Sequence, residues 1–460
     1  MSDTYAQPAA HPLRWRILGF LGVAQLMLIL DVTVVAIALP HMETDLGLSR
    51  ATMTWVVSAY TLTFGGLMLL GGRLADLLGA KRIALTGLLV FTAASLVTGL
   101  AGSSGVLLGG RIAQGVGAAL LSPSALSLVV GLFDGEERNK ALGVWSALGG
   151  GGAALGVLLG GLITAGPGWP WVFWINVPIG LVIAVTLARL LPRAVAAAPG
   201  GRLDALGALL VTASSGSLVY ALIHAGDQGW LTATTGWLVL AAAVGYLAFV
   251  AWQRTTRAPL MDVRLLARRP VATGTFLILM ATALTVAVFF LGTFYFQHER
   301  HYGALPTGLL FLPVALLTMA GANLTGKALG RFGARPLAVT GLLIAAAGLI
   351  LPALAMHPAV VAISLAVTGA GTGVLFVVAS ATALGQVAPH EAGIASGIVS
   401  TFHEFGASLG AAVVSSVAAA SLVAQTLSGF RGGFLVFAVI AVAAAIVAAV
   451  LAPRRAAAAS

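Results

Sequence analysis

The chain contains no cysteine and very little charge. Without cysteine it forms no disulfide bond and offers no thiolate for chemistry. Only 8% of the 460 residues are charged and 59% are hydrophobic, which leaves too little polar surface to cover a soluble globule of this size. We therefore expect lipid to be its solvent.

Several sequence patterns of catalysis are also missing. There is no Gly-x4-Gly-Lys-Ser/Thr loop, so an ATP-driven pump has no support. His and Glu do not occur at the spacing of metal ligands, and no long polar stretch is large enough to form a catalytic domain. We expect no metal, no cofactor and no enzymatic activity.

What the chain does have is long apolar stretches, fourteen in number. About 20 apolar residues in a helix cross a hydrocarbon core of about 30 Å, and backbone groups in lipid must bond within the segment. The sequence therefore predicts an all-α membrane protein with fourteen transmembrane helices. The predicted spans are 17–40, 52–72, 83–101, 105–132, 141–163, 172–191, 205–224, 234–252, 272–296, 305–325, 337–356, 359–386, 393–420 and 432–452.

The basic residues fall in alternate gaps between these spans. Twenty of the 24 Lys and Arg residues lie on the side of the N-terminus, whereas only Arg50, Arg300 and Arg431 lie on the other and Arg111 lies within a span. Because cytoplasmic loops carry an excess of Lys and Arg, both termini are predicted to be cytoplasmic in a multi-pass plasma-membrane protein. The net charge of +10 is spread over these loops, so we expect no nucleic-acid partner. The first span lacks a small-residue cleavage site after it and is expected to be retained.

A repeated segment divides the chain. Residues 72–82 recur in degraded form at 326–336, an offset of 254 residues. If the repeat relates two six-helix bundles, two spans are left over between them. The predicted organisation is an N-terminal bundle at 1–192, linkers with two extra helices at 193–270, and a C-terminal bundle at 271–460. Duplicated bundles with a cleft between the halves are typical of secondary transporters.

The loop after the second span carries a motif. It consists of two glycines, an acid and two bases, namely Gly72, Asp76, Gly79, Lys81 and Arg82. In this motif the chain resembles the major facilitator superfamily, and within it the drug:proton antiporters with fourteen spanning helices. The resemblance covers almost the whole chain and implies that this loop is a conformational latch between the halves. The alternative is a solvated turn with the charges that topology requires.

Two polar sites within spans fit the same resemblance. Asp31 lies in the middle of the first span, and a carboxylate there should face the interior of the bundle. We predict that it couples transport to protons, the alternative being a structural pair with a neighbouring helix. Arg111 resembles the family's buried arginine and shares a helix face with Gln114. It cannot release its proton, so it would tune a nearby carboxylate or serve a structural role.

The fifth span has a stripe of glycines at Gly152, Gly156 and Gly160, followed by Gly161. It resembles the family's antiporter motif, although Val157 stands where a proline is usual. Such a stripe lets helices pack closely, which is also common outside antiporters. A facilitative importer therefore stays an alternative to antiport.

Glu404 is the other acid well inside a predicted span and is a candidate for proton coupling or for attracting a cationic substrate. A substrate cavity is expected to draw on a set of polar and aromatic residues: Trp55, Ser58, Tyr60, Gln114 and His403. The segment from Trp169 to Gly180 resembles the family's entry to the sixth span, and its aromatics are expected to anchor the outer interface.

The resemblance thus implies a monomeric, proton-coupled efflux carrier working by alternating access, with a hydrophobic or cationic small molecule as substrate and protons as coupling ion. Two alternatives are a dedicated exporter of a self-made metabolite, such as an antibiotic or siderophore, and a transporter-like sensor that does not transport. The 3 Lys against 21 Arg are typical of a GC-rich genome, where metabolite exporters are frequent.

Overall fold

The computed structural model describes residues 12–191, 203–385, 392–417 and 427–453, and within them the chain is helical and has no β-strand. The first group of helices is α1 (Arg14–Leu46), α2 (Arg50–Leu78), α3 (Ala80–Gly99), α4 (Ser104–Leu132), α5 (Gly135–Ala165), α6 (Pro170–Trp174) and α7 (Asn176–Leu190). Then come α8 (Ala205–Gln228), α9 (Ala233–Thr255) and the short α10 (Val263–Ala267). The last group is α11 (Arg269–Phe294), the π-helical turn η1 (Tyr295–Glu299), α12 (Ala304–Phe332), α13 (Ala334–Leu354), α14 (Pro358–Leu384), α15 (Ala392–Val417) and α17 (Leu427–Leu451).

The prediction of an all-α membrane protein is confirmed. Among the described residues, 13 helices are long and apolar enough to cross a membrane. The remaining predicted span, the fifth, falls in α5, where Leu155–Ala165 is a shorter apolar stretch among the described residues. Several helices are longer than the apolar runs: α1 has 33 residues, or about 50 Å at 1.5 Å per residue. Polar turns at helix ends extend a helix beyond its apolar run, which is why hydropathy underestimated the lengths.

Turns between helices are short because specific residues end and begin them. The Ser49 hydroxyl accepts a hydrogen bond from the Thr52 amide and thereby caps α2. A single residue, Gly79, separates α2 from α3 and has a φ of 94°, a left-handed value that favours glycine. Gly333 plays the same part between α12 and α13, with a φ of 84°. The two glycines are 254 residues apart, which is the offset of the sequence repeat.

The same offset recurs in the helix packing. A Cβ added at Gly117 would lie 2.8 Å from the carbonyl oxygen of Gly87, so α3 and α4 touch backbone to backbone. A Cβ added at Gly371 would lie 2.5 Å from the carbonyl oxygen of Gly341, which joins α14 to α13 in the same way. Residues 87 and 117 become 341 and 371 on adding 254. The sequence also predicted two boundaries between parts of the chain. The boundary at 192/193 lies outside the described residues, and the one at 270/271 falls in the first turn of α11. The division of the chain stays a prediction.

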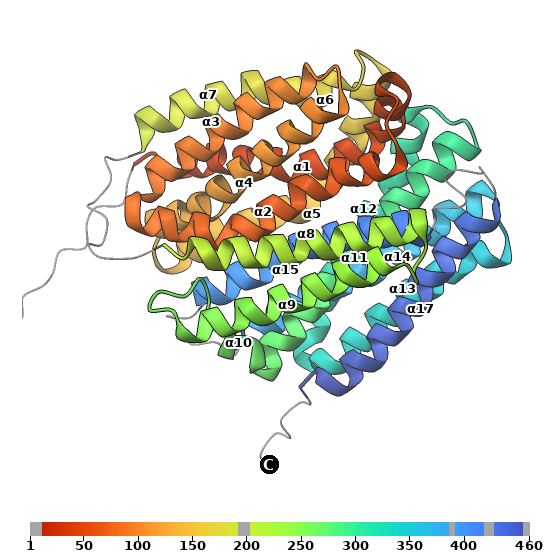
Figure 1. Cartoon of the computed structure of the whole chain (residues 1–460). Coiled ribbons are helices and arrows are strands. Elements are labelled where there is room, and N and C mark those ends of the chain that lie inside the picture. The colour runs from red at the N-terminus through yellow and green to blue at the C-terminus, as the bar shows by residue number, and fades with distance from the viewer. Residues whose placement is uncertain (1–11, 192–202, 386–391, 418–426, 454–460) are drawn as a thin grey trace, which may run out of the picture.

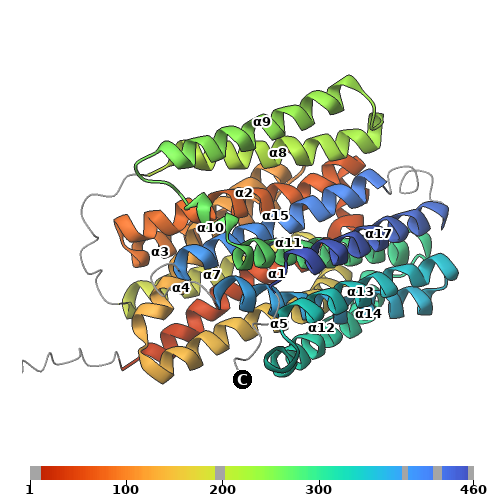
Figure 2. The same cartoon turned by 90° about the horizontal axis from the view of Figure 1, so that it is seen from below.

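The helices form two groups, α1–α7 and α11–α17, which meet along two seams. In one seam α2 packs against α15, and in the other α5 packs against α12. Helices α8 and α9 form a hairpin that lies as a separate layer on one side of the bundle, with α8 resting on α2 and α15 (Figures 1 and 2). The inserted hairpin therefore contacts both groups.

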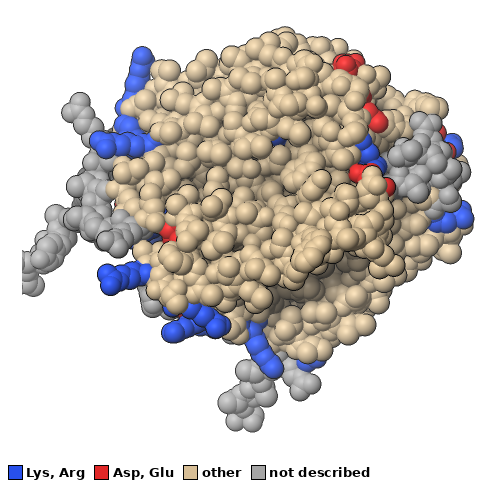
Figure 3. Space-filling model, in the orientation of Figure 1, with Lys and Arg blue, Asp and Glu red and all other residues tan. Residues whose placement is uncertain are grey.

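The two ends of the bundle differ in charge. We call the end where α1 begins the terminal end, and the opposite end, where α1 gives way to α2, the distal end. Figure 3 shows Lys and Arg side chains gathered along the left and lower edge, toward the terminal end, and most of the visible Asp and Glu at the right. This polarity is what the alternation of basic gaps predicts.

Candidate functional site

A buried ion pair joins α1 to α4. The Arg111 guanidinium donates to the Asp31 carboxylate through Nη1, and both side chains are fully shielded from solvent. Arg111 Nη1 also donates to Gln114 Oε1 at 2.9 Å, and its Nε donates to the carbonyl of Val56 on α2 at 2.7 Å. The guanidinium therefore connects three helices through one charge.

Gln114 completes the network from the other side. Its amide donates to Asp31 Oδ1 at 3.2 Å and to Ser95 Oγ of α3 at 2.9 Å. The sequence prediction placed Arg111 and Gln114 on one helix face, and the structure places both beside Asp31. Ser95 was not predicted, because a serine in an apolar helix gives no signal until the fold sets it opposite Gln114. Arg111 Nη2 has no hydrogen-bond partner among the residues that the structure describes.

Two aromatic rings enclose the guanidinium. The Tyr60 ring centroid lies 4.4 Å from Arg111 Cζ and that of Phe173 lies 5.9 Å away, both within the range of a cation–π contact. The Tyr60 hydroxyl donates to the Leu28 carbonyl at 3.2 Å, which fixes the ring against α1. Of the five residues predicted for a cavity, Tyr60 and Gln114 are thus part of the Asp31 site.

The glycine stripe of α5 packs on the segment of α1 that carries Asp31. A Cβ at Gly152 would lie 2.8 Å from Ile29 Cγ2, and one at Gly160 would lie 3.0 Å from Val34 Cα. One at Gly156 would collide with the Thr33 hydroxyl. The three glycines therefore let α5 pack closely on the part of α1 that contains Asp31.

Gly161 belongs to a different contact. A Cβ there would lie 2.8 Å from the carbonyl oxygen of Ala304 at the start of α12. A Cβ at Gly308 would likewise lie 2.8 Å from the carbonyl oxygen of Val157, the residue that replaces the proline of the family motif. One face of α5 therefore holds α1 and another holds α12 at the distal end.

Glu404 lies on α15, in the opposite group, and does not touch Asp31. It is 8% exposed and packs against α2, where a Cβ at Gly65 would lie 2.6 Å from its own Cβ. It has no hydrogen-bond or ion-pair partner among the described residues. Tyr60 lies within electrostatic range of both acids. The two carboxyl groups thus occupy opposite sides of α2.

His403, the neighbour of Glu404 in α15, points toward α11 and away from Asp31. His403 Nδ1 lies 2.9 Å from the Thr282 hydroxyl, and its ring centroid is 5.8 Å from that of Phe376. Trp55 is also remote from Asp31, because its ring faces Tyr220 of α8 at 6.5 Å. The structure does not gather the five predicted cavity residues into one site.

Ser58 lies on the seam between α2 and α15. Its hydroxyl donates to the carbonyl of Ser408 at 3.4 Å, and the side chain is fully buried. The residue therefore ties the two groups together near Glu404.

The predicted latch lies at the terminal end and contacts its own group. Asp76 is exposed and, within the described ranges, pairs only with Arg73, one turn earlier in α2 at 3.9 Å. Lys81 donates to the carbonyls of Ala188 and Leu191 at 2.9 and 2.6 Å, which caps the end of α7. Gly72 and Arg82 complete the motif, and Arg82 is exposed.

Polar contacts between the two groups are found at the distal end. Gln297 of η1 donates to the carbonyl of Ile37 at 3.0 Å, and His298 Nε2 lies 3.1 Å from Glu43 Oε2. Trp169, expected to anchor an interface, is 5% exposed and donates instead to Asp45 at 2.8 Å.

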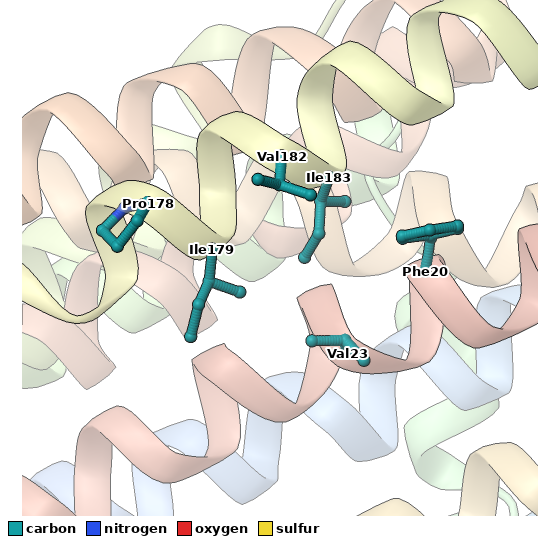
Figure 4. Close-up of a pocket in the computed structure, with 6 residues that line it drawn as sticks. All are labelled: Phe20, Val23, Pro178, Ile179, Val182 and Ile183. Carbon is teal, nitrogen blue, oxygen red and sulfur yellow. The ribbon is translucent and has the colours of Figure 1, made fainter.

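An apolar groove of about 310 Å³ opens between α1 and α7. Figure 4 shows the six side chains that line it: Phe20, Val23, Pro178, Ile179, Val182 and Ile183. No polar group lines the groove, so it is an apolar surface suited to contact with lipid and is separate from the Asp31 network.

Comparison with known proteins is consistent along the whole chain. The Major Facilitator Superfamily profile matches residues 21–411 and 324–460. Puromycin resistance protein pur8 of Streptomyces alboniger is 38% identical, with 98% of this chain and 93% of that protein covered. Multidrug resistance protein Stp of Mycobacterium tuberculosis is 34% identical over 87% of this chain and 75% of its own length.

A solved structure of a bacterial homologue of the human lysosomal transporter Spinster, in an inward-facing and unoccupied conformation, has the same fold. The TM-score is 0.69 at 17% identity, over 97% of this chain and all of the other. With its helical architecture, profile match and relatives in agreement, the chain belongs to the major facilitator superfamily.

Proposed function

We propose that the protein exports a hydrophobic or cationic small molecule across the plasma membrane in exchange for protons, by alternating access. In this proposal it works as a monomer with both termini in the cytoplasm. The terminal end of the bundle is then the cytoplasmic end and the distal end faces outward. Membership of the superfamily supports transport, and relatives named for multidrug and puromycin resistance support export.

The observation that carries the proton coupling is the buried pair of Asp31 and Arg111. A carboxylate in the interior of a membrane protein is costly unless it is paired, so protonation and pairing compete. When Asp31 takes a proton it becomes neutral, and Arg111 keeps only its bonds to the Val56 carbonyl and to Gln114. Because these bonds connect α1, α2 and α4, a change of protonation changes what holds three helices together.

Glu404 supplies a second protonatable group in the opposite bundle. It has no partner within the described part of the chain, so either a cationic substrate or a proton could satisfy it. In the proposed cycle substrate and proton compete for the carboxyl groups on the two sides of α2. An export step then needs the proton to enter from outside as the substrate leaves.

The placement of the polar contacts supports uptake of substrate from the cytoplasm. The contacts of Gln297 and Glu43 close the distal end, whereas Asp76 of the latch motif pairs with Arg73 of its own helix and with no other described residue. Such a state is closed toward the outside and unlatched toward the cytoplasm. The latch role of Gly72, Asp76, Gly79, Lys81 and Arg82 would be filled in the opposite state.

A dedicated exporter of one antibiotic is the second candidate. Puromycin resistance protein pur8 matches nearly the full length of the chain and is named for a single compound. A narrow substrate range would leave the Asp31 network and its coupling unchanged, so substrate range and mechanism are separate questions. A sensor that binds without transport would differ in both.

The test uses inverted membrane vesicles with an acidic interior, followed by a pH-sensitive dye. A panel of lipophilic cations, neutral drugs and puromycin is added to vesicles with the parent, Asp31→Asn, Glu404→Gln or Asp134→Asn. Asp134 is the matched control, because its side chain is 90% exposed and loses the same charge. The expected result is proton release with the parent and the control but not with Asp31→Asn.

The outcomes separate the candidates. Release by many compounds supports a multidrug antiporter, and release by one compound supports a dedicated exporter. Binding of compounds without any proton release or uptake would contradict the proposal and favour a sensor. Compound uptake that persists without a pH gradient would instead indicate a facilitator.

A further inference from the structure

Arg50, at the distal start of α2, joins its own helix to two others. Its side chain is 7% exposed although it sits at a helix end. One terminal nitrogen, Nη1, donates to the backbone carbonyl of Ser415 on α15 and, at 2.9 Å, to the Ser415 hydroxyl. The other, Nη2, forms an ion pair with Asp227 of α8. Arg50 therefore bridges the seam between the two groups, and its one acidic partner among the described residues comes from the inserted hairpin.

The hairpin is fitted closely to both sides of that seam. A Cβ at Gly226 would lie 2.6 Å from Ser416 Cα, so α8 and α15 touch backbone to backbone beside the ion pair. Farther along, a Cβ at Gly66 of α2 would collide with the Thr212 side chain of α8. A helix that merely filled a lateral face would not need such approach to both α2 and α15.

We propose that Asp227 is a positioning residue of the transport cycle: it holds Arg50 across the distal seam, and so makes the inserted hairpin α8–α9 part of the outer closure. This inference rests on the proposed alternating access, in which α2 and α15 must separate at the distal end. Opening breaks the bonds from Arg50 to Ser415. The bond to Asp227 can persist, since α8 packs against both α2 and α15.

The charge of Asp227 matters because Arg50 is buried only while the seam is closed. A buried guanidinium without a counter-charge is unfavourable, and water restores its solvation when the seam opens. Removing the Asp227 charge therefore weakens the closed state more than the open state. The expected effect is a population shift toward distal opening, and not only a loss of stability.

The test measures the distance across the distal end in the full chain. Because the protein has no native cysteine, Ser104→Cys and Ala355→Cys can be spin-labelled without background; both positions are exposed and lie in distal turns of the two groups. Distances are measured by pulsed EPR in nanodiscs, with and without transported compound and at two pH values. The variants are Asp227→Asn, Asp227→Glu and the charge-loss control Asp134→Asn.

We expect Asp227→Asn to raise the ratio of open to closed distances about tenfold, within the range typical of coupling between two states. Asp227→Glu should move the ratio back toward the parent, and Asp134→Asn should match the parent. Melting temperatures of all variants are measured in parallel, because a purely structural role would lower them without changing the ratio.

Two negative results have different meanings. If the parent switches between distances but Asp227→Asn follows it within twofold, the inference is overturned while the proposed function stands. If the parent keeps a single distance under every condition, alternating access itself is contradicted.

Discussion

Replacing Asp31 by Asn is the most direct perturbation of the site, because it removes a charge and almost no volume. Asp31 and Arg111 both have fully shielded side chains. Removing one partner of a buried ion pair leaves the other charge uncompensated, at a cost of about 3–5 kcal/mol. Arg111 keeps its bonds to Val56 and Gln114, so we place the cost at the lower part of that range.

The expected change in melting temperature follows from the size of the unit that unfolds. Residues 12–191 form a group of 180 residues, and for domains of this size 1 kcal/mol corresponds to about 2–4 °C. Arg111→Gln should therefore lower the melting temperature by about 6–20 °C, and Asp31→Asn by an amount in the lower part of that range. The double variant contains no unpaired charge, so its loss should be clearly smaller than the sum of the two.

The assay is thermal unfolding in detergent or nanodiscs, followed by proton release in inverted vesicles. The double variant should recover stability but not proton release, which separates the structural part of the pair from its coupling. Additive single losses, or losses within 2 °C of the parent, would refute the view that this pair is buried and mutually dependent. Asp134→Asn should leave both measurements at the parental value.

Three further changes have local outcomes. Gly117→Ala places a methyl group 2.5 Å from the backbone nitrogen of Phe91 and should cost about 1–3 kcal/mol of stability by overpacking. Gly109→Ala in the same helix meets no atom within 4 Å and should not destabilise the protein. The melting temperatures of the two variants test this difference. Lys81→Ala should cost about 0.3–1 kcal/mol, seen as a small drop in melting temperature that Lys81→Arg reverses, because the amine caps α7. The hydrogen bond from Arg14 lowers the pKa of Glu137. The difference in stability between the parent and Glu137→Gln should therefore be constant from about pH 7 to pH 5. It should shrink below about pH 4, where the carboxylate is protonated.

The helices were predictable because each apolar run had to find a partner for its backbone within itself. Their lengths were less so, since α1 extends to Arg14 and Leu46, well past the apolar stretch 17–40. The repeat was visible in sequence only through its loop motif. Its deeper expression, the glycine contact between α3 and α4 and its counterpart between α13 and α14, needed the structure because each pair of glycines is 30 residues apart in the chain.

The site was predictable where one side chain was costly enough to demand an explanation. Asp31 and Arg111 stood out as charges in apolar spans, and the structure pairs them. Trp55 did not join them, because an aromatic ring in a membrane helix is equally satisfied against α8. The role of Arg50 was missed since its partners, Asp227 and Ser415, are 177 and 365 residues away.

The close contacts between glycines in each group limit which substitutions this chain can tolerate during evolution. At positions 87 and 117 any side chain would push α3 from α4, and at 341 and 371 the same holds for α13 and α14. A library of all single substitutions should therefore show intolerant positions in pairs displaced by 254 residues. The surrounding lipid-facing positions, free of such contacts, are where the sequence can drift without loosening either group.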